Sequence, residues 1–326
     1  MVPMPVMALP TMIKNGYSPK LAAGTVASAG TLGILIPPSV MLVFMGDILT
    51  INLAKLFIAA LVPGLALAVA YMTYIAISTL LKPDQAPVIP PLSHAEKAGL
   101  WREALVSFSL PVLLIVAVLG SIVGGLATPT EAAAVGAFAA LVLGLARRRL
   151  NWAVLGTAMD GSIRTIAMFF FIFVAATGFA YVFRIIGGEH FIVDITNGLN
   201  MGDWGVLAML MLIIFAMGFF FDWIEITLII LPIVAPIVAI MDFGDHINQS
   251  DLIYWFAVLM AVNLQTSFLT PPFGFALFYL KGAGDLVSMR EIYQGIIPFV
   301  LLQIGVLLLL VWQPWIVTWL PNAVLN

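Results

Sequence analysis

The stretch "GTLGILIPPSVMLVFMG", residues 30–46, places two adjacent prolines in the middle of an apolar run long enough to enter a membrane. Pro37 and Pro38 have no backbone N–H, and Pro37 also disfavours helical geometry at Ile36. Carbonyl groups in the preceding turn therefore lose their helical hydrogen-bond donors. In hydrocarbon this loss is tolerated only where protein or a water-filled cavity surrounds the backbone. The stretch thus predicts a helix that is broken inside the membrane.

The composition predicts an all-α integral membrane protein. The chain has 326 residues, of which 63% are hydrophobic and 9% charged, whereas soluble domains carry about 25% charged residues. A net charge of -3 gives no basic surface for nucleic acid. Cysteine is absent and the three histidines lie apart in polar connectors, so neither a disulfide nor a zinc site is expected.

Apolar segments of about 20 residues predict the membrane crossings. A polar segment at 82–102 reads as a loop between two groups of crossings. Five segments read as ordinary spans, two as helices broken by a proline pair, and one as a hairpin. The spans are 52–80, 104–125, 130–149, 165–186 and 292–320, the broken helices are 20–46 and 250–281, and the hairpin is 204–241.

The segment 204–241 is too long for a single crossing at about 1.5 Å per residue. Its charged residues, Asp222 and Glu225, lie near the middle in "FFFDWIEI" (219–226). Asp222 followed by Glu225 is typical of a helix start. The segment therefore predicts a re-entrant hairpin with its tip at Asp222–Thr227. Carboxylates inside a membrane indicate function, but helix capping explains this pair as well.

Basic residues sort onto one face when the connectors are assigned to alternate sides of the membrane. Lys55 and Arg184 are the exceptions, and the opposite connectors are acidic or neutral. The positive-inside rule makes the basic face cytoplasmic. Arg147, Arg148 and Arg149 read as topology anchors on that face.

The two proline pairs belong to a predicted inverted repeat. Pro271-Pro272 follows Pro37-Pro38 at an offset of 234, and each pair precedes a span with an early proline, Pro63 or Pro298. The two broken helices cross in opposite directions, a pattern that marks the midplane site of secondary transporters. We expect one repeat over 1–102 and the other over 103–326. The chain is expected to begin inside the first hairpin, with about 130 residues of that repeat upstream.

Small and oxygen-bearing residues surround both proline pairs. Such neutral oxygens, with freed carbonyls, suit a hard monovalent cation, although close helix packing or interhelical hydrogen bonds would use the same residues. Gln265 belongs to the same polar run. The candidate cation ligands are Ser28, Gly30, Thr31, Gly33, Asn263, Thr266, Ser267 and Thr270.

Five segments resemble the large membrane subunit of tripartite ATP-independent periplasmic (TRAP) transporters, in order and over nearly the whole chain. They are "LPTMIKNGYSP" (9–19), "GTLGILIPPS" (30–39), "GLATPTEAAAVGAF" (125–138), "FFFDWIEITLIILPIVAP" (219–236) and "NLQTSFLTPPFGFALF" (263–278).

The resemblance implies an elevator-type, sodium-coupled importer of organic acids in the bacterial inner membrane. It also implies a small membrane subunit and a periplasmic binding protein as partners, with sodium ions for coupling and no other cofactor. Its sodium sites would lie between hairpin tips and the segments 28–39 and 263–274. Residues expected to meet the substrate are Pro37, Pro38, Ser39, Asp222, Glu225, Pro271, Pro272 and Gly274.

Two other function classes stay open at the level of sequence. A membrane enzyme would need a nucleophile with a base, or a metal cluster, and the carboxylate pair Asp222 and Glu225 has no histidine beside it in the sequence. The sequence lacks the "GxxxxGK[ST]" motif that would indicate an ATP-driven pump. A purely structural membrane subunit is the remaining alternative, because the first hairpin is incomplete.

Overall fold

The computed structural model describes residues 3–87, 94–188, 191, 198, 201–271, 274–282 and 286–325, and all regular structure among them is helical. Seven helical segments in this part of the chain are long and apolar enough to cross a membrane, the first of them spanning both halves of the Pro37-Pro38 segment. The prediction of an all-α, multi-pass membrane protein is confirmed.

The helices follow one another with short connections. The first part of the chain forms α1 (Pro3–Lys14), α2 (Pro19–Leu35), α3 (Val40–Ile48), α4 (Leu53–Leu81), α5 (His94–Val123), α6 (Pro129–Ala146) and α7 (Trp152–Ile185). The second forms α9 (Gly202–Met217), α10 (Trp223–Glu225), the π-helix η2 (Ile226–Ile230), α11 (Leu231–Ala239), α12 (Gln249–Leu269), α13 (Phe275–Gly282), α14 (Met289–Trp312) and α15 (Trp315–Leu325). Single 3-10 turns lie at Pro83–Gln85 and Gly244–His246.

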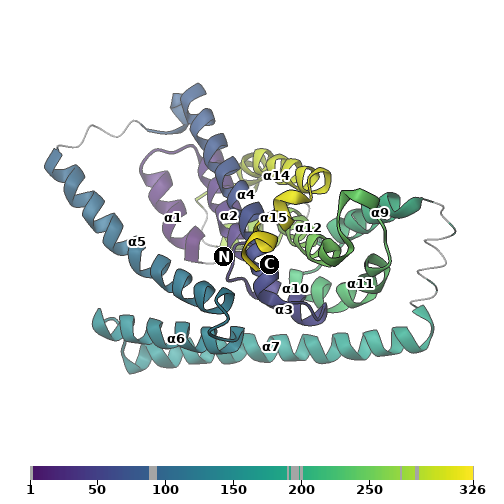
Figure 1. Cartoon of the computed structure of the whole chain (residues 1–326). Coiled ribbons are helices and arrows are strands. Elements are labelled where there is room, and N and C mark those ends of the chain that lie inside the picture. The colour runs from purple at the N-terminus through teal and green to yellow at the C-terminus, as the bar shows by residue number, and fades with distance from the viewer. Residues whose placement is uncertain are drawn as a thin grey trace. The chain divides into compact units, whose positions relative to one another are not determined.

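The chain divides into two compact units, residues 1–87 with 172–326, and residues 88–171. In the first unit α12 is the central helix and packs against α2, α4, α9 and α14 (Figure 1). The side chains of Trp255, Phe256 and Leu259 on α12 are fully buried. A helix that is apolar on most of its circumference is stable only when other helices surround it.

Each broken helix in the first unit packs against the long helix that follows the other broken helix. α2 packs on α14 while α12 packs on α4, and α1 packs on α2 and α13 while α11 packs on α12 and α3. A two-fold relation between the two predicted repeats would produce this reciprocal pattern. α2 and α14 approach closely, since a Cβ at Gly24 would lie 2.2 Å from the carbonyl oxygen of Gly295. Glycines at such crossings let membrane helices approach closely.

Some element boundaries differ from the sequence-based prediction. The predicted span 292–320 is two helices, α14 and α15, because Pro314 cannot donate to the helix and α14 ends at Trp312. The predicted span 165–186 is the end of the longer helix α7, which begins at Trp152. The predicted loop 82–102 becomes helical at His94, where α5 begins.

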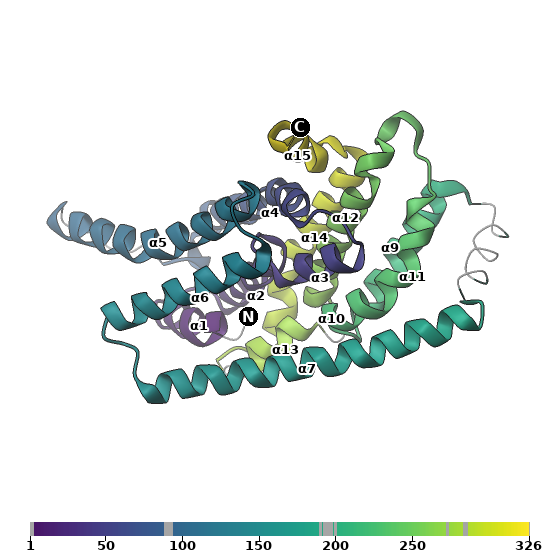
Figure 2. The same cartoon turned by 60° about the horizontal axis from the view of Figure 1, so that its bottom comes forward.

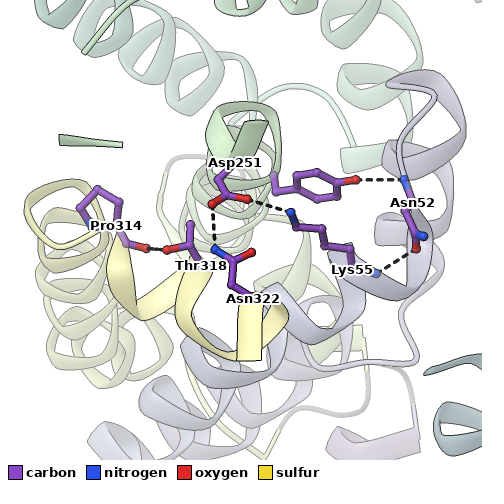
Figure 3. A network of polar contacts seen from close by, with 7 residues as sticks. Asn52, Lys55, Asp251, Pro314, Thr318 and Asn322 are labelled. Atoms are coloured by element: carbon purple, nitrogen blue, oxygen red, sulfur yellow. Dashed lines mark hydrogen bonds and ion pairs between the residues drawn. The ribbon is translucent and has the colours of Figure 1, made fainter. Parts of the chain in front are cut away.

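Polar contacts hold the N-terminal ends of α4 and α12 against the C-terminal helix α15 (Figure 3). Lys55 Nζ lies 2.8 Å from Asp251 Oδ1, and Asn322 Nδ2 donates to Asp251 Oδ2 at 2.9 Å. Lys55 also lies over the ring of Tyr254, whose hydroxyl accepts from the backbone N–H of Asn52. Lys55, an exception to the one-sided distribution of basic residues, is therefore the partner of a buried carboxylate.

Candidate functional site

The first helix break lies at the proline pair that the sequence indicated. α2 ends at Leu35, Ile36 is extended, and α3 restarts at Val40. Ser39 caps α3 by accepting from the N–H of Leu42, and its hydroxyl donates to the carbonyl of Ile34. That carbonyl is the one that Pro38 would otherwise leave without a helical donor. The carbonyl of Gly33 likewise has no helical donor, because residue 37 is a proline and has no N–H.

The second break has the same construction at the end of α12. The helix ends at Leu269, and Thr270 is extended with its N–H donating to the carbonyl of Ser267. The Thr270 hydroxyl donates to the carbonyl of Thr266 at 2.8 Å. Pro271 begins the break, and α13 restarts at Phe275. The predicted interruption of segment 250–281 is therefore present.

The two breaks lie close together in the first unit. α2 packs against both α12 and α13, and α12 packs against both α2 and α3. A hydrogen bond of 3.2 Å joins Gln265 Nε2 on α12 to Thr31 Oγ1 on α2. These residues are 234 positions apart, the offset between the proline pairs. The two residues therefore occupy equivalent positions in the two predicted repeats.

Hydroxyl groups near the breaks donate to carbonyls of their own helix. Thr31 Oγ1 donates to the Ser28 carbonyl, Thr266 Oγ1 to that of Val262, and Ser267 Oγ to that of Leu264, each at 2.8 Å. A hydroxyl that donates in this way keeps its oxygen lone pairs available as acceptors. The side chains of Ser28, Thr31, Thr266 and Ser267 are fully buried.

A second group of neutral polar side chains lies beside the Gln265 amide. The Tyr71 hydroxyl on α4 faces the side chains of Gln265 and of Gln303 on α14. These groups are buried close to one another, but the Tyr71 hydroxyl, the Gln303 amide and Gln265 Oε1 make no well-aligned hydrogen bond to a described residue. Buried polar groups are normally paired with protein or water. The helices α2, α4, α12 and α14 thus each contribute a polar side chain to one buried region.

The hairpin is present, but its turn lies earlier than predicted. α9 ends at Met217, residues 218–222 form the turn, and the returning arm of α10, η2 and α11 begins at Trp223 (Figure 2). Asp222 caps the returning arm by accepting from the Trp223 N–H at 2.7 Å. The expected tip Asp222–Thr227 is wrong in its extent, because a capping residue starts a helix and the turn must precede it.

The hairpin tip contacts the helices at both breaks. A Cβ at Gly218 would lie 1.9 Å from Ser267 Oγ, so the turn is packed directly against α12 near the second break. On the other side, the Trp223 ring lies 6.2 Å from the Phe44 ring on α3, just after the first break. In the returning arm, Glu225 Oε2 and Thr227 Oγ1 are buried without a hydrogen bond to a described residue. Thr227 lies in the π-helix η2, a form of helix often found at functional sites.

The other predicted site residues are distributed around this meeting point. Asn263 faces the hairpin and donates from Nδ2 to the Met211 carbonyl of α9 at 2.7 Å. Gly30 lies on α2, and Gly33 is exposed beside open space. Pro37 is buried, Pro38 exposed, Pro271 partly buried and Gly274 buried, whereas Pro272 lies outside the described residues.

The structure adds residues that sequence reasoning did not select. Gly218 permits the close approach of the hairpin, and Tyr71 and Gln303 join the buried polar region. No local pattern distinguishes Tyr71 or Gln303 from the other polar side chains of α4 and α14, so the sequence offered no signal for them. Within the described residues, no group of three or more His, Asp or Glu side chains could hold a metal ion. At the ends of α2 and α12 the polar side chains are neutral hydroxyls and amides, whereas the hairpin tip carries the carboxylates of Asp222 and Glu225.

Comparisons with known proteins identify relatives over nearly the whole chain. Residues 1–316 match the family model described as the tripartite ATP-independent periplasmic transporter, DctM component. The chain is 31% identical to the C4-dicarboxylate TRAP transporter large permease protein DctM of Pseudomonas aeruginosa, covering 97% of this chain and 71% of the relative. It is 30% identical to the ectoine/5-hydroxyectoine large permease protein UehC of Ruegeria pomeroyi, covering 96% and 70%, and 30% identical to the isethionate permease protein DctMQ of Oleidesulfovibrio alaskensis, covering 94% and 46%.

Proposed function

Because the chain belongs to the DctM component family of tripartite ATP-independent periplasmic transporters, we propose that it is the permease of a sodium-coupled importer of organic acids. Membership makes it a large permease component, which is a transporter subunit and not an enzyme. The observation that carries the proposal is the meeting of two proline-broken helices and a hairpin tip around buried neutral oxygens. The arrangement does not provide the nucleophile and base that an enzyme would require. A purely structural subunit would not require broken helices with buried polar groups inside the membrane.

Sodium coupling is supported by the type of oxygen at the breaks. The C-terminal ends of α2 and α12 present carbonyl groups whose helical donors are replaced by prolines. Ser28 and Thr31 lie beside the first of these ends, and Asn263, Thr266, Ser267 and Thr270 beside the second. Helix C-termini and neutral oxygens favour a cation without requiring a carboxylate. We therefore assign one sodium site to each break.

The substrate is proposed to bind where the half-helices α3 and α13 begin. Helix N-termini carry partial positive charge and free N–H groups that favour a carboxylate. Ser39 and Pro38 precede α3, Pro271 and Gly274 precede α13, and Asp222 starts the returning arm of the hairpin beside α3. The names of the relatives specify small organic solutes, namely C4-dicarboxylate, isethionate and ectoine.

The inverted repeat and the elevator movement are part of the same proposal. The reciprocal packing of α2 on α14 and α12 on α4, and the Thr31–Gln265 contact at the repeat offset, support two repeats with their boundary near residue 102. The compact units divide the chain at other positions, after residues 87 and 171. An elevator movement would carry the breaks and the hairpin together across the bilayer.

The partners follow from the family rather than from a contact on this chain. We propose that the permease works in the bacterial inner membrane with a small membrane subunit and a periplasmic protein that delivers the substrate. Sodium ions would be the coupling ions, and no other cofactor is proposed.

The test is the sodium dependence of uptake by the complete complex. Thr270→Ala removes a hydroxyl beside the second break. Leaving neighbouring buried polar groups without this partner should weaken sodium binding by about 1–3 kcal/mol. We therefore expect the sodium concentration for half-maximal uptake to rise roughly tenfold. Thr73→Ala is the matched control, since Thr73 makes the same kind of hydroxyl-to-carbonyl bond at 2.7 Å on an exposed face of α4. Equal sodium dependence in the wild type and both variants would contradict the assigned site.

A further inference from the structure

The groove between α5 and α6, inside the compact unit of residues 88–171, is not used by the proposed transport function. Its volume is about 900 Å³, within the range of small-molecule sites. Its walls are mainly apolar, with Leu110 and Leu114 on α5 facing Leu143 on α6. Because both helices are candidate membrane spans, the material in such a groove is expected to come from the bilayer or from another membrane protein.

One end of this groove is polar and basic. Ser107 on α5, and Arg147 and Arg149 just after α6, line it together with the apolar residues. The one-sided distribution of basic residues predicts that this end lies at the cytoplasmic face. Two guanidinium groups and a hydroxyl at the end of an apolar groove complement a phosphate attached to an acyl chain.

The backbone at the end of α6 explains why alternate arginines line the groove. Arg149 N–H donates to the Gly144 carbonyl and Arg148 N–H to the Leu145 carbonyl, the pair of bonds that defines a Schellman cap. The position with positive φ in this cap usually holds glycine, but here it is Arg148 with φ 52°. The turn brings Arg147 and Arg149 to the groove, and Arg148 is not among the lining residues.

The basic charge at this end is not neutralised by ion pairing within the part of the chain that the structure describes. The ion pair formed among the described residues, Lys55–Asp251, lies in the other compact unit and not at the groove. Glu131 is at the opposite end of α6, where its carboxylate accepts from Thr128. The groove end therefore attracts an anion.

We propose that this groove binds an anionic glycerophospholipid, with an acyl chain between α5 and α6 and the phosphate at Arg147 and Arg149. This inference goes beyond the transport function. A lipid is favoured over a helix of another subunit because the basic residues gather at a single end of the apolar groove, as in a molecule with one charged head and a hydrocarbon tail.

The test uses the complete complex in vesicles of phosphatidylethanolamine containing a photoactivatable phosphatidylglycerol. We expect crosslinks within 107–115 or 140–149, lowered about fivefold by Arg147→Gln and by Arg149→Gln. Arg148→Gln is the charge-matched control and should lower labelling less than twofold. Ala140→Trp, which fills the groove without changing charge, should also reduce labelling. Thermal unfolding of each variant establishes that it is folded.

Several results would overturn the lipid site. Equal losses in all three arginine variants would mean general attraction of anionic lipid to a basic surface. If a photoactivatable phosphatidylethanolamine labelled the groove as strongly as the phosphatidylglycerol probe, the arginines would not select an anionic headgroup. Efficient disulfide crosslinking between Ala140→Cys and a cysteine introduced into the small membrane subunit, under an added thiol oxidant, would show that protein covers the groove. These results are independent of sodium-dependent uptake, so they do not decide the transport proposal.

Discussion

Replacing Gly218 by alanine tests whether the hairpin must touch the second break. The backbone of Gly218 is helical, with φ -64°, so alanine introduces no backbone strain. Its Cβ, however, would lie 1.9 Å from Ser267 Oγ and 2.5 Å from Ser267 Cβ. Rotation of the hydroxyl can remove the first conflict but not the second. Carbon atoms need about 3.5 Å, so the hairpin turn must move away from α12 by roughly 1 Å.

Overpacking of this size costs about 1–3 kcal/mol. If a sodium site needs the hairpin against Ser267, the sodium concentration for half-maximal uptake should rise roughly five- to 140-fold, at about 1.4 kcal/mol for each factor of ten. Gly305→Ala is the control, because a Cβ at Gly305 meets nothing within 4 Å. The double variant Gly218→Ala with Ser267→Gly should restore the packing but not the lost oxygen. Wild-type sodium dependence and thermal stability in Gly218→Ala would refute the reasoning.

Two further predictions concern stability. Lys55→Met leaves the Asp251 side chain, 5% exposed, without its cationic partner, while Asn322 still donates a hydrogen bond to it. The variant should lower the free energy of unfolding by roughly 2–4 kcal/mol, and by more than Asp251→Asn, after which the partly exposed lysine can turn to water. Equal effects in thermal unfolding of the two variants would contradict this asymmetry. Thr128→Ala removes the cap that accepts from the Glu131 N–H, so the first turn of α6 should lose about 1 kcal/mol of stability. Faster amide hydrogen exchange in that turn is the expected result, and unchanged exchange would show that the cap contributes nothing.

Sequence predicted the features that depend on local chemistry. Both helix breaks followed from prolines without N–H groups, and the polar character of α12 near its end followed from the density of hydroxyl and amide side chains. The start of the returning hairpin arm at Asp222 also followed from its capping chemistry. These properties belong to a few adjacent residues and change little with the surroundings.

The remaining features depend on contacts between distant residues. The Gln265–Thr31 hydrogen bond and the Lys55–Asp251 ion pair join residues that are 234 and 196 positions apart. The importance of Gly218 arises from the position of Ser267 on another helix, which no local pattern specifies. The helix boundary at Pro314 was available from the sequence but was hidden by an apolar run on both sides.

Sodium-driven accumulation is the most direct test of the central claim. The complete complex, reconstituted in vesicles with its periplasmic binding protein and a radiolabelled C4-dicarboxylate or related organic acid, should accumulate substrate under an inward sodium gradient. Accumulation should stop when potassium replaces sodium or when the gradient is collapsed. Equal accumulation with potassium, for a substrate that the complex does transport, would contradict the assignment of the broken helices as sodium sites.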